Sequence, residues 1–346
     1  MEFNTLALEL TRACPNRCKY CYGQGRVVNG NMSEEVILAS LNYFKKQNEF
    51  SISLLGGEPV LRLNTFLPIL EKFLQNNNNK ISLSLNTNAL LFNKNLCEKL
   101  KKFNPKIAIS LDGPKEIHDF NRIDVYNNGT YERVVEKIPL ILDYFPDAFC
   151  QATFTPDTIY GLSDSYFLAK DLGFKEWYWA PDLYNSEWKE IHFLELEKQM
   201  KIISNDYFQQ NKILYKPFER LEDRNKGNLR FKKDTHCLLV APDGLSKISR
   251  VNATIIDIES DKEWYIGNIL NGLDKEKIEN WINKYGEEAD RLYYAFNTRS
   301  ECSQCLANNI CYNTEHSLEN IYLYKIQCQQ PRIQCEQKKA IMKALI

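Results

Sequence analysis

Residues 5–21 read TLALELTRACPNRCKYC, and the architecture of the chain can be inferred from this segment. Residues 5–10 form a short apolar run of the length expected for a buried strand. Cys14, Cys18 and Cys21 follow at once with the spacing C-x3-C-x2-C. The segment therefore predicts a strand whose outgoing loop carries three closely spaced thiols.

The same alternation of a strand and a longer amphipathic segment continues to about residue 180. Further strands are predicted at 51–55, 80–85, 107–111, 149–154 and 175–179. Helices are predicted at 33–47, 63–74, 93–102, 130–144 and 163–172, with Ser33 as a start signal and Gly173 as a stop signal. Six strand–helix repeats favour a parallel α/β fold, in which functional residues gather after the carboxyl ends of the strands.

The second half of the chain has a different pattern. A long amphipathic helix is predicted over residues 186–210, followed by a charged segment at 211–235. Pro242-Asp243-Gly244 predicts a hairpin turn, and a helical segment is predicted near 273–295. We therefore expect three parts: a barrel at 1–210, a bridging segment at 211–236 and a cysteine-rich domain at 237–346.

Composition limits the class of protein. The chain has 346 residues, is 44% hydrophobic and balances 44 basic against 45 acidic residues, so nothing favours a nucleic-acid partner. No apolar run of about 18 residues predicts a membrane span. The amino end is too short and too polar for a secretory signal, so eleven cysteines indicate a reducing cytoplasmic protein with metal-bound thiols.

The first cysteine group has the ligands of an iron–sulfur cluster. Thiolates are the preferred ligands of such clusters. Three ligands on a four-iron cluster leave one iron open to a substrate or cofactor. The alternative is a zinc site with a remote fourth ligand, although zinc prefers paired C-x2-C units.

At these residues the sequence resembles the radical SAM superfamily, including the aromatic Tyr20 before the third cysteine. The resemblance implies a partial (β/α)6 barrel and a [4Fe-4S] cluster on Cys14, Cys18 and Cys21. It also implies that S-adenosylmethionine binds the open iron through its amino and carboxylate groups. Reductive cleavage of this cofactor would then give a 5′-deoxyadenosyl radical.

Further positions match the cofactor-binding motifs of the superfamily. Glu58 in GGEP would accept a hydrogen bond from the methionine ammonium, Ser110 would bond the ribose, and Arg122 would pair with the methionine carboxylate. The full set of expected cofactor-binding residues is Tyr20, Gly56, Gly57, Glu58, Asn86, Asn88, Ser110, Arg122 and Ala180.

The second cysteine group resembles the SPASM extension of radical SAM peptide-modifying enzymes. Two of its usual ligand positions are occupied by Ser249 and Glu315, so we expect one auxiliary [4Fe-4S] cluster. Its expected ligands are Cys302, Cys305, Cys311 and Cys335, with Cys328 as the competitor of Cys335. A zinc site in this tail is an alternative, as is a second cluster held by Cys237, Cys328 and Glu315.

Cys150 lies on the predicted fifth strand. A buried cysteine of this kind is most often a packed core thiol. Its alternative role is that of a hydrogen-atom donor to a substrate radical.

The resemblance implies an enzyme that matures a ribosomally made precursor peptide, by a carbon–carbon or thioether crosslink. The expected partners are that peptide, an electron donor such as flavodoxin or ferredoxin, and a separate leader-binding protein, since Cys14 comes too early for a fused leader-binding module. Alternatives are a peptide epimerase, a sulfatase-type maturase that forms formylglycine, and a degenerate metal-stabilised binding protein. Ser249 and Arg250 argue against the sulfatase type, which has an aspartate base in this region.

Overall fold

The structure is a computed structural model of the whole chain. It describes residues 3–21, 23, 30–182, 187–209, 214–215, 237–249, 265–283, 336, 339, 340 and 343.

The described strands form a single sheet. They are β1 (Thr5–Thr11), β2 (Glu49–Gly56), β3 (Lys80–Thr87), β4 (Lys106–Ser110), β5 (Phe149–Phe154), β6 (Glu176–Pro181), β7 (Leu214–Tyr215), β8 (Cys237–Val240), β9 (Leu245–Ser249), β10 (Tyr265–Asn268) and β11 (Gly272–Leu273). Their order across the sheet is β11-β10-β9-β8-β1-β2-β3-β4-β5-β6-β7.

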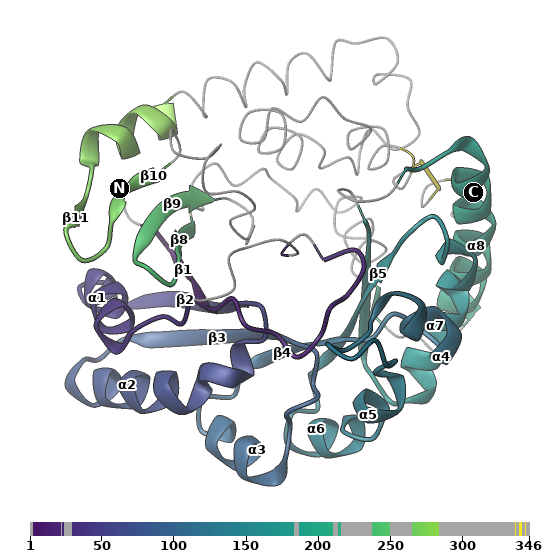
Figure 1. Cartoon of the computed structure of the whole chain (residues 1–346), viewed down its shortest axis with the longest axis horizontal. Helices are drawn as coiled ribbons and strands as arrows, with labels where there is room; N and C mark the ends of the chain where they lie inside the picture. Colours follow the sequence, from purple (N-terminus) through teal and green to yellow (C-terminus); the bar gives the residue numbers. More distant parts are fainter. Residues whose placement is uncertain are drawn as a thin grey trace.

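The helices cover the outer side of this curved sheet (Figure 1). They are α1 (Glu34–Phe44), α2 (Leu63–Asn76), α3 (Lys94–Lys101), α4 (Lys115–Asn121), α5 (Tyr131–Val135), α6 (Ile138–Tyr144), α7 (Leu162–Asp171) and α8 (Glu190–Gln209), and residues 275–283 are also helical. Pairing from β1 through β7 is parallel throughout. The predicted partial (β/α)6 barrel is therefore confirmed.

Alternation along each strand separates the core from the concave side of the barrel. On β1, Leu6, Leu8 and Leu10 are fully buried within the main apolar core. Each such leucine contributes about 1.5–3 kcal/mol relative to an exposed one. Residues of the opposite parity face inward, so the barrel interior can carry polar side chains.

The predicted start and stop signals act as expected. Ser33 caps α1 by accepting a hydrogen bond from the Val36 N–H at 3.2 Å, and Gly173 takes a positive φ of 89° after α7. The prediction of one helix over 130–144 is wrong, because two short helices, α5 and α6, stand there. Pro139 lies in the first turn of α6, where it lacks an N–H, so the helix restarts at this point.

The hairpin around Pro242 is confirmed. β8 and β9 pair antiparallel on either side of the turn, and Gly244 takes a φ of 85°. β8 also pairs in parallel with β1, so the barrel sheet continues across the predicted boundary at residue 237.

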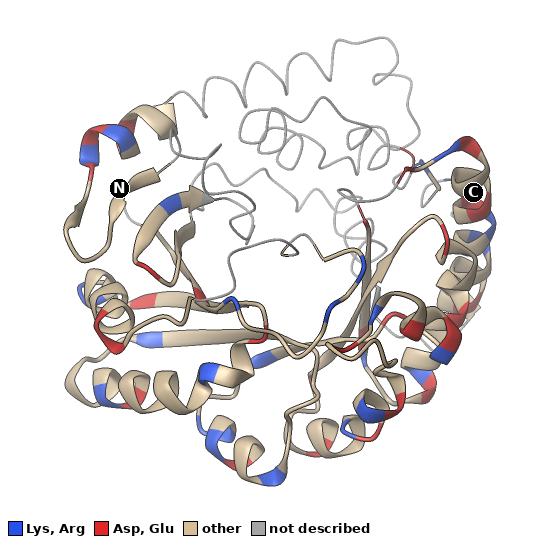
Figure 2. Ribbon diagram, viewed as in Figure 1, with Lys and Arg blue, Asp and Glu red and all other residues tan. Residues whose placement is uncertain are grey.

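The charged residues on the outer helices are of mixed sign in the coloured part of Figure 2. None of the described helices is long and apolar enough to cross a membrane.

Candidate functional site

The loop that carries Cys14, Cys18 and Cys21 is held by the last residue of α4 and the segment that follows it. The Arg17 N–H donates to the Ile123 carbonyl at 2.7 Å, and the Lys19 N–H donates to the Asn121 carbonyl at 2.9 Å. Further along, Asn16 and Asp124 form an isolated antiparallel bridge. The backbone of the loop is thus ordered by its own protein partners.

The glycine pair after β2 permits close approach of the same loop. The Gly57 N–H donates to the Thr11 carbonyl at 2.8 Å, and the Glu58 N–H donates to the Ala13 carbonyl at 2.9 Å. A Cβ atom at Gly57 would lie 2.3 Å from the Ala13 oxygen, and Gly56 has a φ of 129°. Both positions therefore require glycine.

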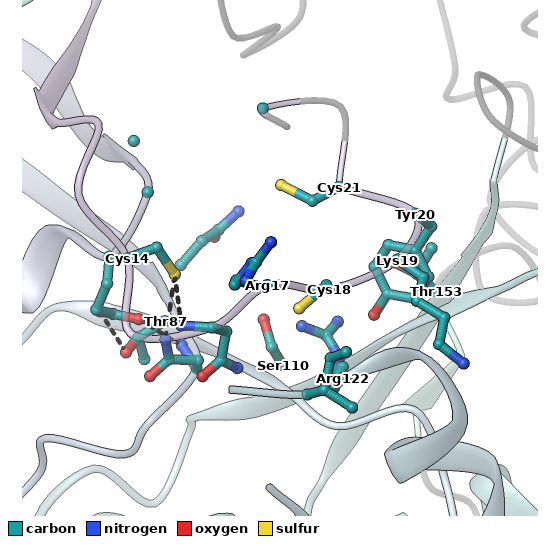
Figure 3. Close-up of a pocket in the computed structure, with 18 of the residues that line it drawn as sticks. Cys14, Arg17, Cys18, Lys19, Tyr20, Cys21, Thr87, Ser110, Arg122 and Thr153 are labelled. Carbon is teal, nitrogen blue, oxygen red and sulfur yellow. Dashed lines mark hydrogen bonds between the residues drawn. The ribbon is translucent and has the colours of Figure 1, made fainter. Parts of the chain in front are cut away.

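The predicted residues line one cavity of about 1040 Å³ at the carboxyl ends of the strands. The three cysteines are among its walls, and in Figure 3 their sulfur atoms face a common space next to Ser110 and Arg122. The predicted cofactor-binding residues that line it are Tyr20, Gly56, Gly57, Glu58, Asn86, Asn88, Ser110, Arg122 and Ala180. The cavity thus brings together residues from six strand ends that span more than half of the chain.

Asp112 is a buried residue that supports the cavity wall and to which the sequence analysis assigned no role. Its carboxylate accepts a hydrogen bond from the Tyr20 hydroxyl at 2.6 Å and pairs with Arg122 Nε at 3.0 Å. It also accepts from the Thr153 N–H at 2.8 Å and is 1% exposed. Its place directly after Ser110 and Leu111, at the end of a predicted strand, was the signal that could have found it.

Arg122 lies between this carboxylate and the aromatic ring of the cysteine loop. Its guanidinium carbon is 5.3 Å from the Tyr20 ring centroid. Burial lowers the pKa of Arg122, but attraction by Asp112 and the neighbouring acidic groups outweighs this effect and the pKa is raised. Arg122 stays charged and pairs with Asp112 through its Nε, and because a guanidinium has five N–H donors and Arg122 lines the cavity, it can also serve a group bound there.

His118 fixes the position of this pair without reaching the cavity. Its Nδ1 accepts from the Asp112 N–H at 3.3 Å, so its Nε2 carries the proton and donates to Thr130 Oγ1 at 2.9 Å. Thr130 in turn donates to the Arg122 carbonyl at 3.1 Å. Burial lowers the pKa of His118 well below its usual value, so the ring remains neutral.

Glu58 joins the ends of β2 and β3. Its carboxylate accepts from the Val60 N–H at 3.1 Å, from Thr87 Oγ1 at 2.8 Å and from the Asn88 N–H at 2.8 Å. Burial raises the pKa of this carboxyl to about 7, although the three hydrogen bonds oppose the shift. Since a carboxylate has about four acceptor sites, capacity remains for a cation in the cavity.

The thiol set fits an iron–sulfur cluster better than a single metal ion. In the part of the chain that the structure describes, no group of three or more His, Cys, Asp or Glu side chains is placed to hold one ion. Ligands of one zinc ion must converge on a point, whereas each ligand of a four-iron cluster binds a different iron atom. Burial raises the pKa of Cys14 to about 12, so metal binding must displace its proton.

Cys150 lies on the opposite face of β5 from the cavity. It is 1% exposed and its thiol donates to the Leu111 carbonyl at 3.4 Å, whereas the next residue, Gln151, lines the cavity. A one-residue alternation sends these side chains to opposite faces. Trp177 and Trp179 are likewise fully buried in the core. This position of Cys150 does not support a role as hydrogen-atom donor.

The second cysteine group lies outside the described residues. This holds for Cys302, Cys305, Cys311, Cys328 and Cys335, and also for Glu315 and Arg250. The expected auxiliary cluster therefore remains a prediction.

Several known proteins are similar to this chain. Residues 8–169 match the family model of the Radical SAM superfamily. A cysteine-type anaerobic sulfatase-maturating enzyme of Clostridium perfringens is 25% identical over 328 residues, which cover 86% of this chain and 84% of that protein. An uncharacterised protein of Methanocaldococcus jannaschii is 34% identical over 126 residues, and the match spans 43% of its length.

Two solved structures share the fold. The structure of anSMEcpe with bound AdoMet and Kp18Cys peptide has a TM-score of 0.70 and 22% identity, covering 89% of this chain and 87% of that chain. The structure of Streptococcus suis SuiB bound to the precursor peptide SuiA has a TM-score of 0.55 and 16% identity, covering 79% of this chain and 66% of that chain.

Proposed function

Residues 8–169 are a radical SAM domain and the chain is an enzyme; from this premise we propose that it modifies a ribosomally made precursor peptide. We propose further that the modification is a carbon–carbon or thioether crosslink. The observation that carries the proposal is that Cys14, Cys18 and Cys21 open on the same cavity as Glu58 and Arg122.

In this proposal the residues of the chain position two bound groups. Cys14, Cys18 and Cys21 hold a [4Fe-4S] cluster by three of its irons. When both are bound, the cluster and S-adenosylmethionine supply the 5′-deoxyadenosyl radical. The walls of the cavity keep water away from the reacting atoms.

The polar residues of the cavity are proposed to hold the S-adenosylmethionine. Glu58 would accept a hydrogen bond from its ammonium, Arg122 would pair with its carboxylate, and Ser110 would bond its ribose. The Tyr20 ring and the backbone after Gly56 and Gly57 shape the rest of the pocket, with Asn86, Asn88 and Ala180 along its walls.

The proposed crosslink balances as a two-electron oxidation of the peptide. One hydrogen atom leaves the peptide for the adenosyl carbon, a second leaves as a proton, and one electron passes to an acceptor. We propose an auxiliary [4Fe-4S] cluster on Cys302, Cys305, Cys311 and Cys335 (or Cys328 in place of Cys335) as that acceptor. An external donor such as flavodoxin or ferredoxin would supply the first electron, and a separate protein would bind the leader.

A peptide substrate is supported by the relatives. The relative from Clostridium perfringens is named for maturing a sulfatase, and the SuiB structure was solved with a precursor peptide bound. A sulfatase and a precursor peptide are both polypeptide chains, which favours the same substrate class here.

Formylglycine formation is a second candidate. It is favoured by the match to the sulfatase-maturating enzyme, which extends over 86% of this chain. The absence of an aspartate at residues 249–250, which read Ser-Arg, argues against it. A crosslink removes two hydrogen atoms from the peptide, whereas conversion of cysteine to formylglycine removes its sulfur.

The test uses the anaerobically reconstituted full chain with S-adenosylmethionine, dithionite and candidate peptides from neighbouring short reading frames. We expect about eight irons per chain if the two proposed four-iron clusters are present. A peptide that loses two hydrogens supports the crosslink, loss of sulfur supports formylglycine formation, and uptake of one solvent deuterium at an α-carbon indicates epimerisation.

A further inference from the structure

Two asparagine side chains lie beside the thiols of the cysteine loop: Asn88 donates to Cys14 Sγ, and Asn16 is buried in the cavity wall. We infer that both are positioning residues, that the Asn88 amide donates to the Cys14 thiolate and the Asn16 amide to a sulfur of the bound cluster, and that these bonds raise the reduction potential of the proposed cluster. The inference rests on the proposed function, because it requires the cluster on Cys14, Cys18 and Cys21.

The orientation of Asn88 is set by its own backbone contacts. Its Oδ1 accepts from the Leu90 N–H at 3.1 Å, so its amide nitrogen must point the other way. That nitrogen donates to Cys14 Sγ at 3.7 Å. The backbone of Asn88 is tied to Glu58 by a 2.8 Å hydrogen bond, which holds the amide in place beside the sulfur.

Asn16 presents a different and independent observation. The residue is 8% exposed and lines the cavity, yet neither Nδ2 nor Oδ1 makes a hydrogen bond with any residue that the structure describes. Leaving a buried amide without partners is destabilising. Such a group two residues from Cys18 is best explained by an acceptor that the bound cluster brings into the cavity.

The backbone keeps Asn16 in this place. Its own N–H donates to Cys14 Sγ at 3.4 Å, and it bridges to Asp124 on the segment after α4. The Asn88 amide thus approaches a ligand sulfur with its positive end, and the buried Asn16 amide faces the same cavity without a partner among the described residues.

The sign of the effect follows from charge. Reduction adds an electron to the cluster, and hydrogen bonds to its sulfurs stabilise the more negative state. Removing either donor should therefore make reduction harder.

The test is a potentiometric titration of the reconstituted full-length protein, followed by electron paramagnetic resonance. The signal of the first cluster is identified by its loss in the Cys14→Ala/Cys18→Ala/Cys21→Ala variant. We expect Asn16→Leu and Asn88→Leu each to disfavour reduction by about tenfold, which is about 59 mV for one electron. Asn16→Asp, which keeps the shape and brings a negative charge to the sulfurs, should disfavour reduction further.

Gln151→Leu is the matched control, because Gln151 is an amide that lines the same cavity, has no part in the proposed cluster or cofactor contacts, and shows no side-chain hydrogen bond to a sulfur among the described residues. It should leave the potential of the cluster unchanged. Potentials of Asn16→Leu, Asn16→Asp and Asn88→Leu equal to that of the wild type would overturn the inference. A wild-type protein that binds no iron at the first cysteine group would instead contradict the proposed function itself.

Discussion

The Tyr20 hydroxyl donates a 2.6 Å hydrogen bond to Asp112 Oδ2, across 92 residues of sequence and within the buried wall of the cavity. Tyr20 stands between Cys18 and Cys21, whereas Asp112 follows β4. The bond therefore ties the loop of the cysteines to the strand end that carries Ser110. Loss of this bond should therefore lower the free energy of unfolding of the barrel.

Tyr20→Phe tests this bond. The change removes one hydrogen bond to a charged group but keeps the ring under Arg122, so we expect a loss of about 1.5–3 kcal/mol in the free energy of unfolding. Urea denaturation under anaerobic conditions measures it. Tyr126→Phe is the control, since Tyr126 is 81% exposed. Equal stability of the Tyr20 variant and the control would show that the bond contributes nothing.

Asp112→Asn tests the buried ion pair with Arg122. Because the variant leaves a buried guanidinium without a counter-charge, it should destabilise the protein by about 3–5 kcal/mol. The double variant Asp112→Asn/Arg122→Met removes both charges and should recover part of that loss. A double variant less stable than the single one would mean that Arg122 has another partner.

Glu58 gives the protein a defined pH dependence. Burial raises the pKa of this carboxyl to about 7 from 4.5, so the folded state binds its proton more tightly than the unfolded state. The associated stability is fully present below about pH 4.5 and is lost as the pH rises through 7.

Comparison with Glu58→Gln isolates this contribution. The wild type should lose stability relative to the variant between pH 4.5 and 7, by roughly 3 kcal/mol at most for the shift of the pKa. The measurement is the free energy of unfolding of both proteins, without metal or cofactor, across this pH range. Parallel curves would contradict a raised pKa at Glu58.

Gly57→Ala tests the close approach of the cysteine loop. The added methyl group would meet the Ala13 and Arg12 carbonyl oxygens, both of which are backbone atoms. The loop must shift, so we expect the iron content per chain after reconstitution to fall by about the four irons of the first cluster. Gly173→Ala, at a positive φ of 89° after α7, controls for a general loss of stability and should keep its iron.

The barrel could be predicted well from the sequence because each strand and each helix end is marked by residues close together in the chain. Strands β1 to β6 appear as short apolar runs, and caps such as Ser33 and Gly173 mark helix ends. Two features of the helices were not predicted. The hydrophobic pattern over residues 130–144 favours one helix, but Pro139 divides it into α5 and α6. The helix α4 is too short to show a clear periodicity in the sequence.

The cavity residues were predicted by their motifs, but their interactions were not. Asp112 and His118 gain their roles only from partners far along the chain, such as Tyr20 and Thr130. Whether Cys150 faces the core or the cavity depends on how β5 is placed in the sheet. The alternation of residues 149–154 alone does not decide which set of side chains faces the cavity.

The most direct test of the account is the formation of 5′-deoxyadenosine from S-adenosylmethionine by the reduced, oxygen-free protein. We expect the wild type to form it, and the Cys14→Ala/Cys18→Ala/Cys21→Ala variant to form none. Continued formation by the triple variant, or zinc in place of iron at this loop in the wild type, would contradict the radical-forming site proposed for this cavity.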